Sequence, residues 1–550
     1  MSEGAAKKEE KPRKFQAVRG TRDLFPPETE LWNRVERAAH EVFATFGFGE
    51  IRLPIFEPTE LFARSIGEET DVVSKEMYTF VDRTEKLGPE PKIGAFGIFI
   101  EKVRELYRSG EIPQTGGNQL ALEHMESAWK KFNGLSPDVA ISLEDLDNAY
   151  QMTAYMDAMR LGIEISLRPE ATASVCRAYV EHGMQALPQP VKLYYMGPMF
   201  RRERPQKGRY RQFYQIGAEV LEKEVASGEW PLEARGKRVA SKEGKEVTSG
   251  PPQAGVASKE LAKDAAVDAE VIEMVIAFFD RLELQGVQLD INSIGDRNCR
   301  PKYIELLRAE LLKVKDKLGL DSQRRIETNP LRVLDSKLES EQGIIATLPR
   351  IGDHLCEECA THYAAVKHQL EMRGVIYREN WRLVRGLDYY MRTTFEITAK
   401  GLGSQNAVCG GGRYDGLVEL LGGPPTKGIG FAIGEDRLIL SLQESGKGVV
   451  ATGRDVYIAW MGERAHATAI RAAKDLRKAG FSVELPPVEQ KFGKALGQAD
   501  KLGAKYALIL GDNEVSEGLW TLKTLADGSQ AKFTEPDLLE HLRKQKALSS

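Results

Sequence analysis

The chain has 550 residues, of which 42% are hydrophobic and 29% charged. It is longer than a single domain normally is, holds enough apolar residues for sizeable cores, and contains no run of about 18 apolar residues that could cross a membrane. Because its formal net charge is only −4, the overall charge gives no sign of a nucleic-acid partner, and such evidence must be local.

The N-terminal residues 1–14 are charged, rich in small residues and without an apolar stretch. They predict a disordered tail rather than a secretory or organellar signal. The chain has five cysteines. A number that is small and odd argues against a disulfide framework and fits a reducing, cytoplasmic setting.

The next part of the chain alternates ordered patterns with two insertions. A helix that ends at Gly47 is predicted after Pro26-Pro27, and a short strand over 51–55. Residues 84–160 look like a separate insertion with helical patterns near 98–108, 119–133 and 143–160. Strand-like sequence from 164 to 219 encloses a helix over 170–183. A second insertion at 223–264 is poor in apolar residues, and we interpret it as a flexible loop.

The C-terminal half begins with a helix over 265–284 and a strand over 289–293, and residues 297–375 are mostly helical in pattern. Strand patterns return between 382 and 435, with turns at 401–412, and a helix begins near Glu435. Residues 441–454 read as a linker. The last part has strands at 456–460, 481–485 and 506–510 and helices at 465–479 and 492–502. This alternation predicts a small α/β domain with a parallel or mixed sheet.

The densest chemical signal is the segment 200–215, FRRERPQKGRYRQFYQ, in which basic residues far outnumber the single acid, Glu203. Turn-forming residues 205–208 lie between strand-like ends and predict a hairpin. Guanidinium groups beside aromatic rings suit the phosphates and the base of a nucleotide. A solvated basic hairpin is the alternative interpretation.

Two further segments each allow two interpretations. In LVRGLDYY (383–390), Arg385 could be carried into a cleft to meet an anion, or it could pair structurally with Asp388. In CGGGRYDG (409–416), three glycines could let a ligand approach the backbone closely, or they could only form a hairpin turn.

Two more segments place polar residues at predicted helix starts. In GIGFAIGEDRL (428–438), Arg437 lies in the first turn of a helix, where a cation fits poorly unless it faces an anionic ligand. The alternative is an arginine that faces solvent. In LRPEATA (167–173), Glu170 and Thr172 could cap a helix or bind the ammonium group of a ligand.

A cysteine motif is the remaining candidate. The segment HLCEEC (354–359), followed by His362, has the spacing of zinc ligands. The alternative is a helix with two thiols on neighbouring turns, which the surrounding helical pattern favours. We therefore expect no metal ligand among the protein side chains.

Together these segments resemble class II aminoacyl-tRNA synthetases and, among them, the histidyl-tRNA synthetase family. RGTRDL (19–24) with the helix after it resembles the first class motif, residues 200–219 the second and 428–438 the third. RGLDYY (385–390) and GGRYD (411–415) resemble two segments peculiar to histidine-specific members. The chain departs mildly from the family with Ala171, where many members have Gly, and with Asp436, where Glu is usual.

The resemblance implies an α+β catalytic domain over 15–440, with an antiparallel sheet flanked by helices. The 84–160 and 223–264 insertions interrupt it, as does the family's helical insertion domain at 297–375. Residues 455–550 resemble an α/β anticodon-binding domain. Because the family's first motif forms a dimer interface, the resemblance also implies a homodimer.

The site residues follow from the resemblance. Arg201 and Arg385 would act as the catalytic residues at the α-phosphate. The residues implied to bind ATP, which would carry its own Mg²⁺, are Arg201, Glu203, Arg209, Phe213 and Arg437. Those implied to bind histidine are Glu170, Ala171, Thr172, Gln215, Glu219, Arg385, Tyr389, Tyr390 and Tyr414. Glu219 and Tyr390 would hydrogen-bond the two imidazole nitrogens, and Arg204 and Gln206 would contact tRNA.

The implied activity is that of a ligase, which activates L-histidine with ATP and transfers it to tRNA(His). Two alternatives stay open at this stage. Some proteins that resemble this family are regulatory subunits in histidine biosynthesis, but they lack the C-terminal domain that this chain keeps. A synthetase specific for another amino acid is the second, and the segment 385–390 with the pair Glu219 and Tyr390 weighs against it.

Overall fold

The structure is a computed structural model that describes residues 15–67, 70, 72–82, 93–110, parts of 112–127, 163–224, 254–400, 406–447 and 453–549. The predicted tail at 1–14 lies outside the described residues, as do the insertion segments 128–162 and 225–253. The chain divides into two compact units, residues 1–23 with 35–446 and residues 24–34 with 447–550. Among the helices described, none is both long and apolar enough to cross a bilayer.

The first unit is built on an eight-stranded sheet in the order β1-β5-β6-β11-β10-β9-β7-β8. Its strands are antiparallel except at the two ends, where β1 pairs with β5 and β7 with β8 in parallel. The strands are β1 (Gly49–Glu50), β5 (Val191–Phe200), β6 (Gln212–Lys223), β7 (Gln288–Ser293), β8 (Arg378–Glu379), β9 (Met391–Thr398), β10 (Ala407–Arg413) and β11 (Thr426–Gly434). The predicted α+β architecture with an antiparallel sheet is confirmed.

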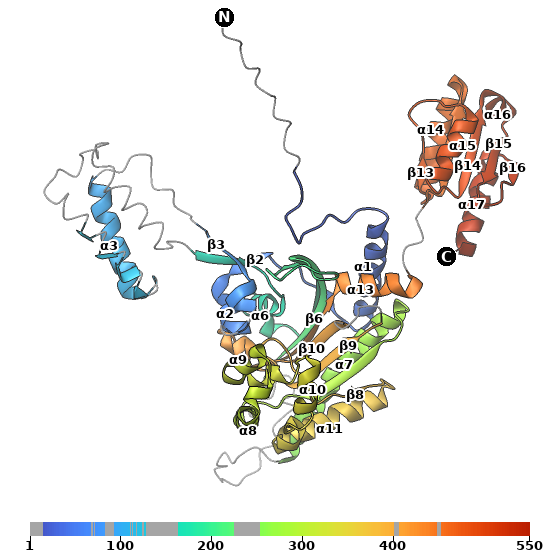
Figure 1. Ribbon diagram of the computed structural model, residues 1–550. Helices are drawn as coiled ribbons and strands as arrows, with labels where there is room; N and C mark the ends of the chain where they lie inside the picture. Colours follow the sequence, from blue (N-terminus) through green and yellow to red (C-terminus); the bar gives the residue numbers. More distant parts are fainter. Residues whose placement is uncertain are drawn as a thin grey trace, which may run out of the picture. The chain divides into compact units, whose positions relative to one another are not determined.

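Two long helices, α7 (Ala254–Arg281) and α11 (Glu357–Met372), run side by side next to this sheet (Figure 1). Buried residues of α7 such as Ile272, Val275 and Phe279 supply its packing face. The prediction of a flexible loop over 223–264 is wrong at its C-terminal end, because α7 begins at Ala254. The alanine-rich sequence that follows has a high helix propensity, which the low content of large apolar residues concealed.

A three-stranded sheet in the order β2-β4-β3 adjoins the helix α2 (Thr59–Ile66), which also packs against α6 (Thr172–Glu181) and α12 (Leu417–Leu420). Its strands are β2 (Phe56–Pro58), β3 (Tyr78–Asp82) and β4 (Ile163–Leu167). The predicted strand at 51–55 is wrong, because strands occur only before and after it. Pro54 has no N–H to give to a ladder, and the carbonyls of Leu53 and Pro54 instead accept hydrogen bonds from Arg168.

The insertion at 84–160 connects two strands that pair with each other. β3 and β4 are antiparallel neighbours, with Asp82 directly opposite Ile163. The first helical pattern of the insertion is the helix α3 (Ile93–Ser109). The last one, near 143–160, lies outside the described residues. The chain thus departs and returns at adjacent points of one sheet.

Residues 300–372 are helical, as predicted. The segment contains α8 (Arg300–Lys313), η5 (Lys315–Lys317), α9 (Leu320–Thr328), η6 (Pro330–Val333), α10 (Glu339–Ile345), η7 (Ile351–His354) and α11. Leu307, Leu311, Ile326, Val333 and Ile345 form its buried apolar core, which also includes Tyr390. The segment therefore packs directly against the residues 385–390 that were expected to reach the site.

Two sequence predictions in the second half are corrected. Turns were expected over 401–412, but residues from Ala407 onward form the strand β10; 401–405 lie outside the described residues. A linker was expected over 441–454, but the helix α13 (Glu435–Leu442) and the π-helical turn η8 (Gln443–Lys447) occupy its first half. The predicted helix start near Glu435 is confirmed.

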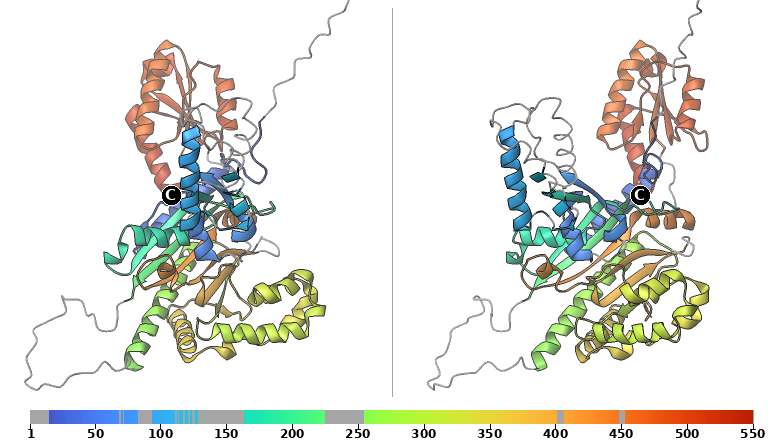
Figure 2. Two further views of the ribbon diagram at one scale, coloured as in Figure 1. Left: turned by 90° about the vertical axis from the view of Figure 1, so that its left-hand side faces the viewer. Right: turned by 60° about the vertical axis from the view of Figure 1, so that its left-hand side comes forward.

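The C-terminal unit has a five-stranded mixed sheet between two helical layers, which both views in Figure 2 show. Parallel strands β13 (Val483–Glu484), β12 (Val456–Met461) and β14 (Tyr506–Gly511) adjoin antiparallel β15 (Trp520–Thr524) and β16 (Gln530–Phe533). Its helices are α14 (Glu463–Lys478), α15 (Phe492–Lys501), α16 (Asp512–Glu517) and α17 (Glu535–Ser549). The predicted α/β domain with a mixed sheet is confirmed.

Candidate active site

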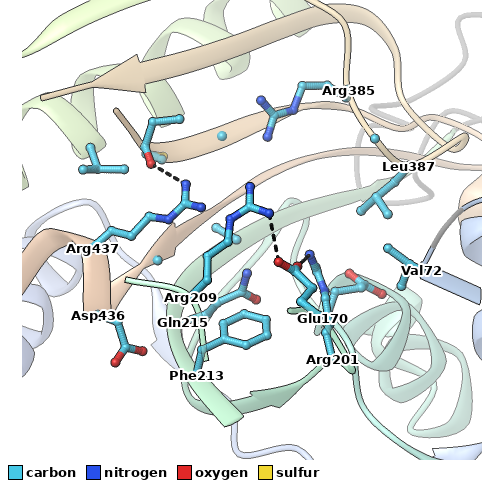
Figure 3. Close-up of a pocket in the computed structure, with 18 of the residues that line it drawn as sticks. Val72, Glu170, Arg201, Arg209, Phe213, Gln215, Arg385, Leu387, Asp436 and Arg437 are labelled. Carbon is cyan, nitrogen blue, oxygen red and sulfur yellow. Dashed lines mark hydrogen bonds and ion pairs between the residues drawn. The ribbon is translucent and has the colours of Figure 1, made fainter. Parts of the chain in front are cut away.

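A cavity of about 500 Å³ lies over the middle of the eight-stranded sheet. Figure 3 shows its side chains, with guanidinium groups directed into the same space from separate segments. The predicted site residues that line it are Glu170, Thr172, Arg201, Glu203, Arg209, Phe213, Gln215, Arg385, Tyr389, Tyr390 and Arg437. The fold therefore brings together residues from four separate stretches of the chain.

The predicted hairpin is formed by β5 and β6. Its connecting loop holds Arg209, whose Nη1 donates to Glu203 at 2.9 Å. The guanidinium carbon of Arg201 lies 5.3 Å from the centre of the Phe213 ring, and its Nε donates to the Pro169 carbonyl at 2.9 Å. A cation is thus fixed beside a flat ring at the cavity wall. This disagrees with the alternative of a wholly solvated hairpin.

The two residues predicted to contact tRNA lie on the same loop but face elsewhere. Arg204 and Gln206 are exposed and do not line the cavity. Gln206 forms an isolated β-bridge with Arg209, which tightens the loop. The loop thus has an inner face that contributes arginines to the cavity and an outer face that is open to solvent.

Arg437 lies in the first turn of α13, as predicted, and its Nη1 donates to the Ala407 carbonyl at 3.0 Å. Burial lowers the pKa of Arg437, and the positive charge of the neighbouring Arg209 lowers it further. Partly buried guanidinium groups that repel one another are stabilised when an anion comes between them. This end of the cavity is therefore built to hold phosphates or a similar anion.

Arg385 pairs with Glu396 of β9, where Nη1 and Oε2 are 3.0 Å apart. The alternative of a structural pair with Asp388 is wrong. Asp388 lies instead close to Gly67 and accepts a long hydrogen bond of 3.5 Å from Asn329. The Nε of Arg385 is buried without a partner among the described residues, so the side chain keeps a free donor for an anion.

The glycine run 409–412 is a strand, not the hairpin turn that was the alternative. It belongs to β10, which pairs with β9 and β11 on its two sides. A Cβ added at Gly410 would lie 1.8 Å from Arg385 Nη2. Glycine is required there because the guanidinium group lies directly on the strand backbone. Gly410 thus lets a side chain of the site approach the sheet.

Glu170 caps a helix and also lines the cavity, so both interpretations of this segment have support. Its carboxylate accepts hydrogen bonds from the backbone N–H groups of Thr172 at 2.7 Å and Ala173 at 3.0 Å, at the start of α6. Burial raises the pKa of the Glu170 carboxyl, while these N–H groups act against that shift. A negative charge here would meet a positively charged ligand group.

Glu219 of β6 lies just beneath the cavity and is 1% exposed. It accepts hydrogen bonds from Thr172 Oγ1 at 2.7 Å and from the Tyr414 hydroxyl at 2.6 Å. Three residues of the predicted histidine set, Ala171, Glu219 and Tyr414, do not line the cavity themselves. Glu219 and Tyr414 instead support Thr172, which does. Burial raises the pKa of the Glu219 carboxyl to about 8.

This raised pKa predicts a pH-dependent stability. The Glu219 carboxyl has a pKa near 4.5 in the unfolded chain and about 8 in the folded protein. The folded state therefore binds this proton more tightly, and the stability gained from it disappears once the carboxyl is ionised in both states. The wild type should therefore lose stability as the pH rises from about 5 to about 8, and Glu219→Gln, which cannot ionise, should lose less. Melting temperatures of ligand-free protein measure this, and identical pH profiles of the two proteins would contradict it.

Several lining residues carried no sequence signal. The Tyr195 hydroxyl and the Gln215 Oε1 are buried without a hydrogen-bond partner among the described residues, so both are free to bind a ligand. Gln215 was predicted, but Tyr195 was missed because it reads as an ordinary strand aromatic. Glu396 and Arg332 were missed as well. Only the alternation of polar and apolar residues in β9 could have pointed to Glu396.

Asp436, the mild departure from the family pattern, joins three segments. Its carboxylate accepts hydrogen bonds from the Tyr214 backbone N–H at 2.9 Å and from Arg22 Nη2 at 3.0 Å. Arg22 also lies over the Tyr210 ring, 4.6 Å from its centre. The shorter acid thus still reaches its partners and holds the segment 19–24, the hairpin and α13 together around the cavity.

The arginine of the GGRYD segment is structural. Arg413 is 2% exposed and bonds to Asp268 of α7, with Nη2 and Oδ1 2.6 Å apart, and to Asp415. His362 of α11 lies beside this pair, with its Nε2 3.4 Å from an Asp268 oxygen. Burial lowers the pKa of His362. The histidine therefore belongs to this buried network and not to the cysteine motif with which its spacing associated it.

The fold and cavity can now be compared with known proteins. Residues 155–231 match the model of the tRNA synthetase class II core domain (G, H, P, S and T), and residues 455–545 match that of an anticodon binding domain. An antiparallel sheet that carries an arginine-rich cavity, together with these two matches, defines a class II aminoacyl-tRNA synthetase.

The particular family follows from the remaining matches. Residues 239–438 match the histidyl-tRNA synthetase model. The histidine–tRNA ligase of Koribacter versatilis is 43% identical to this chain, and the match covers 97% of each of the two chains. That of Solibacter usitatus is also 43% identical, and its match covers 96% of this chain and 99% of the relative. The crystal structure of the apo histidyl-tRNA synthetase of S. aureus is 30% identical, with a TM-score of 0.62 over 96% of this chain and 100% of that one. The chain belongs to the histidyl-tRNA synthetase family.

Proposed function

We propose that this protein is a histidine–tRNA ligase that makes histidyl-adenylate from L-histidine and ATP and then transfers histidine to tRNA(His). The observation that carries the proposal is the convergence of Arg201, Arg209, Arg385 and Arg437 on one cavity. Four guanidinium groups over one sheet suit a triphosphate, and the relatives that match nearly the whole chain are histidine–tRNA ligases.

The ATP side of the cavity follows from its charges. Phe213 offers a face for adenine, and Glu203 lies within reach of the base edge. Arg201 and Arg385 face the α-phosphate, and Arg209 and Arg437 hold the outer phosphates. The histidine carboxylate attacks the α-phosphorus, the bond to the bridging oxygen breaks, and pyrophosphate leaves. Fixed guanidinium groups stabilise the charge that develops on the phosphoryl oxygens, so no protein nucleophile is needed.

The histidine side lies around the start of α6. Glu170, Thr172 and the unpartnered Gln215 Oε1 offer acceptors for the ammonium group. Tyr390 lines the cavity and would hydrogen-bond one imidazole nitrogen, and Glu219, which lies behind Thr172, is our candidate for the other. Tyr389, whose hydroxyl donates to Glu170 at 3.4 Å, holds that carboxylate. A site that hydrogen-bonds both ring nitrogens rejects apolar amino acids strongly.

Magnesium would arrive with ATP. Two carboxylates that line the cavity, Glu203 and Glu396, are each paired with one of its arginines, and oxygen ligands of this kind suit Mg²⁺. When bound, Mg²⁺ neutralises phosphate charge.

The transfer step needs tRNA. A terminal ribose hydroxyl attacks the carbonyl of the adenylate, and AMP leaves with the phosphate oxygen. The exposed Arg204 and Gln206 on the outer face of the hairpin loop are our candidates for contact with the acceptor end. The C-terminal unit would bind the anticodon. We further infer a cytoplasmic homodimer, on the basis of the resemblance of residues 19–24 to the dimer motif.

The test is ATP–pyrophosphate exchange with each amino acid in turn, followed by aminoacylation of tRNA(His) transcript. Exchange with histidine only, together with charging, supports the proposal. Exchange with a different amino acid would overturn the specificity. A protein that showed no exchange at all, although its thermal unfolding transition was intact, would overturn the enzyme assignment in favour of a regulatory subunit.

The insertion at 84–160 should be dispensable for adenylation. Because Asp82 and Ile163 are opposite each other in a strand pair, its deletion leaves Arg83, Leu161 and Gly162 as a short hairpin loop. We expect pyrophosphate exchange within about threefold of wild type, which is a difference of less than 1 kcal/mol in the barrier. Loss of exchange in a deletion variant that keeps its unfolding transition would contradict the prediction that the insertion takes no part in adenylation.

A further inference from the structure

Three cysteines and an aspartate meet at one point of the first unit, and the proposed activity does not use them. Ligand atoms of Asp296, Cys299, Cys356 and Cys359 all lie within 4.8 Å of one another. Asp296, Cys299 and Cys359 are buried, and Cys356 is partly buried. Asp296 and Cys299 come from the segment after β7, while the other two come from the start of α11.

The separations fit a tetrahedral metal site. Zinc–sulfur bonds of about 2.3 Å and zinc–oxygen bonds of about 2.0 Å give tetrahedral edges of roughly 3.8 Å between sulfurs and about 3.5 Å between sulfur and oxygen. The Cys299 and Cys359 sulfurs are 3.8 Å apart. Asp296 Oδ1 lies 3.4 Å from the Cys299 sulfur and 3.9 Å from the Cys356 sulfur. Three of the six separations among the four ligand atoms thus match the edges of a zinc tetrahedron, and the others are no longer than 4.8 Å.

The two halves of the cluster share one sequence spacing, and each places a cysteine at a helix N-cap. Each half contributes two ligands separated by two residues, DRNC at 296–299 and CEEC at 356–359. Cys299 is the N-cap of α8 and Cys356 the N-cap of α11, and helix N-termini favour thiolates. The Asp296 backbone N–H also donates to the Cys299 sulfur at 3.4 Å. Gly295 is required there, since its Cβ would lie 2.7 Å from that sulfur.

A positive group balances the excess negative charge of such a cluster. Three thiolates and a carboxylate carry more charge than one Zn²⁺ neutralises. The Arg392 Nη2 lies 3.6 Å from Asp296 Oδ2 and 3.3 Å from a Glu358 oxygen. An arginine that contacts a ligand carboxylate fixes its orientation, as partners behind metal ligands commonly do.

We propose that Asp296, Cys299, Cys356 and Cys359 bind one structural Zn²⁺. Four protein ligands close the coordination sphere and leave no open position for catalysis. Binding displaces the thiol protons to solvent. The site ties the helical segment that begins with α8 to α11 and the sheet. This goes beyond the proposed function, and it differs from the expectation from sequence that no side chain binds a metal.

The site also supports the neighbouring segment of the cavity. Arg300, next to Cys299, donates from Nη1 to the Tyr390 carbonyl at 2.6 Å. The Arg392 N–H donates to the Gly295 carbonyl at 2.7 Å. Both ends of the stretch from Tyr390 to Arg392 are therefore bonded to residues adjacent to the cluster. Loss of the metal should loosen this stretch as well as the helical segment.

The test measures zinc in full-length protein purified without chelators under reducing conditions. We expect close to one zinc per chain, lost in Cys356→Ser/Cys359→Ser and retained in the matched control Cys176→Ala, a buried cysteine of α6. Cobalt substitution of wild-type protein should give intense thiolate-to-metal absorption, and removal of the metal by a strong chelator should lower the melting temperature by several degrees.

The wild-type measurements keep the proposal falsifiable even if the double variant does not fold. Protein that contains no zinc, and that takes up neither Zn²⁺ nor Co²⁺ with its thiols reduced, would overturn it. A Cys299–Cys359 disulfide found by mass spectrometry in protein prepared without oxygen would overturn it as well. Because pyrophosphate exchange is not among these readouts, failure here leaves the proposed function standing.

Discussion

Replacement of Arg385 by alanine should reduce kcat/KM for histidine-dependent pyrophosphate exchange by about a thousandfold, the loss typical of one preorganised donor that stabilises developing charge. Arg385 is partly buried in the cavity wall and pairs with the carboxylate of Glu396, and its Nε has no partner among the described residues. Its charge is therefore available to the α-phosphate and the histidine carboxylate, where charge moves during adenylate formation.

The loss must be separated from a simple loss of stability. Arg385→Ala leaves Glu396 without its partner, which by itself can destabilise the fold. The double variant Arg385→Ala/Glu396→Gln removes this unpaired charge, and we expect its melting temperature to return toward wild type while exchange stays low. Arg378→Ala is the matched control, because it removes an exposed arginine that pairs with the buried Asp290. This variant should retain exchange. Recovery of exchange in the double variant would contradict a direct role.

The sequence predicted those parts of the fold that depend on local pattern. The spacing of apolar residues and the turn chemistry predict the helix α1 (Glu28–Thr45), the hairpin of β5 and β6 and the alternating C-terminal unit. The strand predicted at 51–55 failed because the carbonyls of Leu53 and Pro54 bond to Arg168, a residue far along the chain. No local pattern records such a partner.

The same distinction separates the site residues. The arginines could be predicted because they cluster in short segments with a recognisable order. Their partners could not, since Glu396 and Tyr195 come from strands that read as ordinary sheet. The cysteine motif shows the limit most clearly. Cys356 and Cys359 were visible as a pair, but Asp296 and Cys299 lie some 60 residues earlier, and only the fold brings the two pairs together.

A methyl group added at Gly410 should impair catalysis while leaving the fold intact. The Cβ of Gly410→Ala would lie 1.8 Å from Arg385 Nη2, and the other close atoms belong to the same guanidinium group. The side chain of Arg385 must therefore move, whereas the backbone of the sheet need not. Because a displacement of about 1 Å in a positioning group can cost roughly a hundredfold in rate, we expect kcat for exchange to fall by about that factor.

The comparison between two glycine substitutions decides whether this effect comes from Arg385. Gly343→Ala adds the same methyl group in α10, where nothing lies within 4 Å, and should leave exchange unchanged. In Gly410→Ala the melting temperature should stay within a few degrees of wild type. If the arginine is the mediator, then adding Gly410→Ala to Arg385→Ala should cost little more, because the group that the methyl displaces is already gone. Additive losses in that double variant would show that Gly410 acts on the ligand itself and not through Arg385.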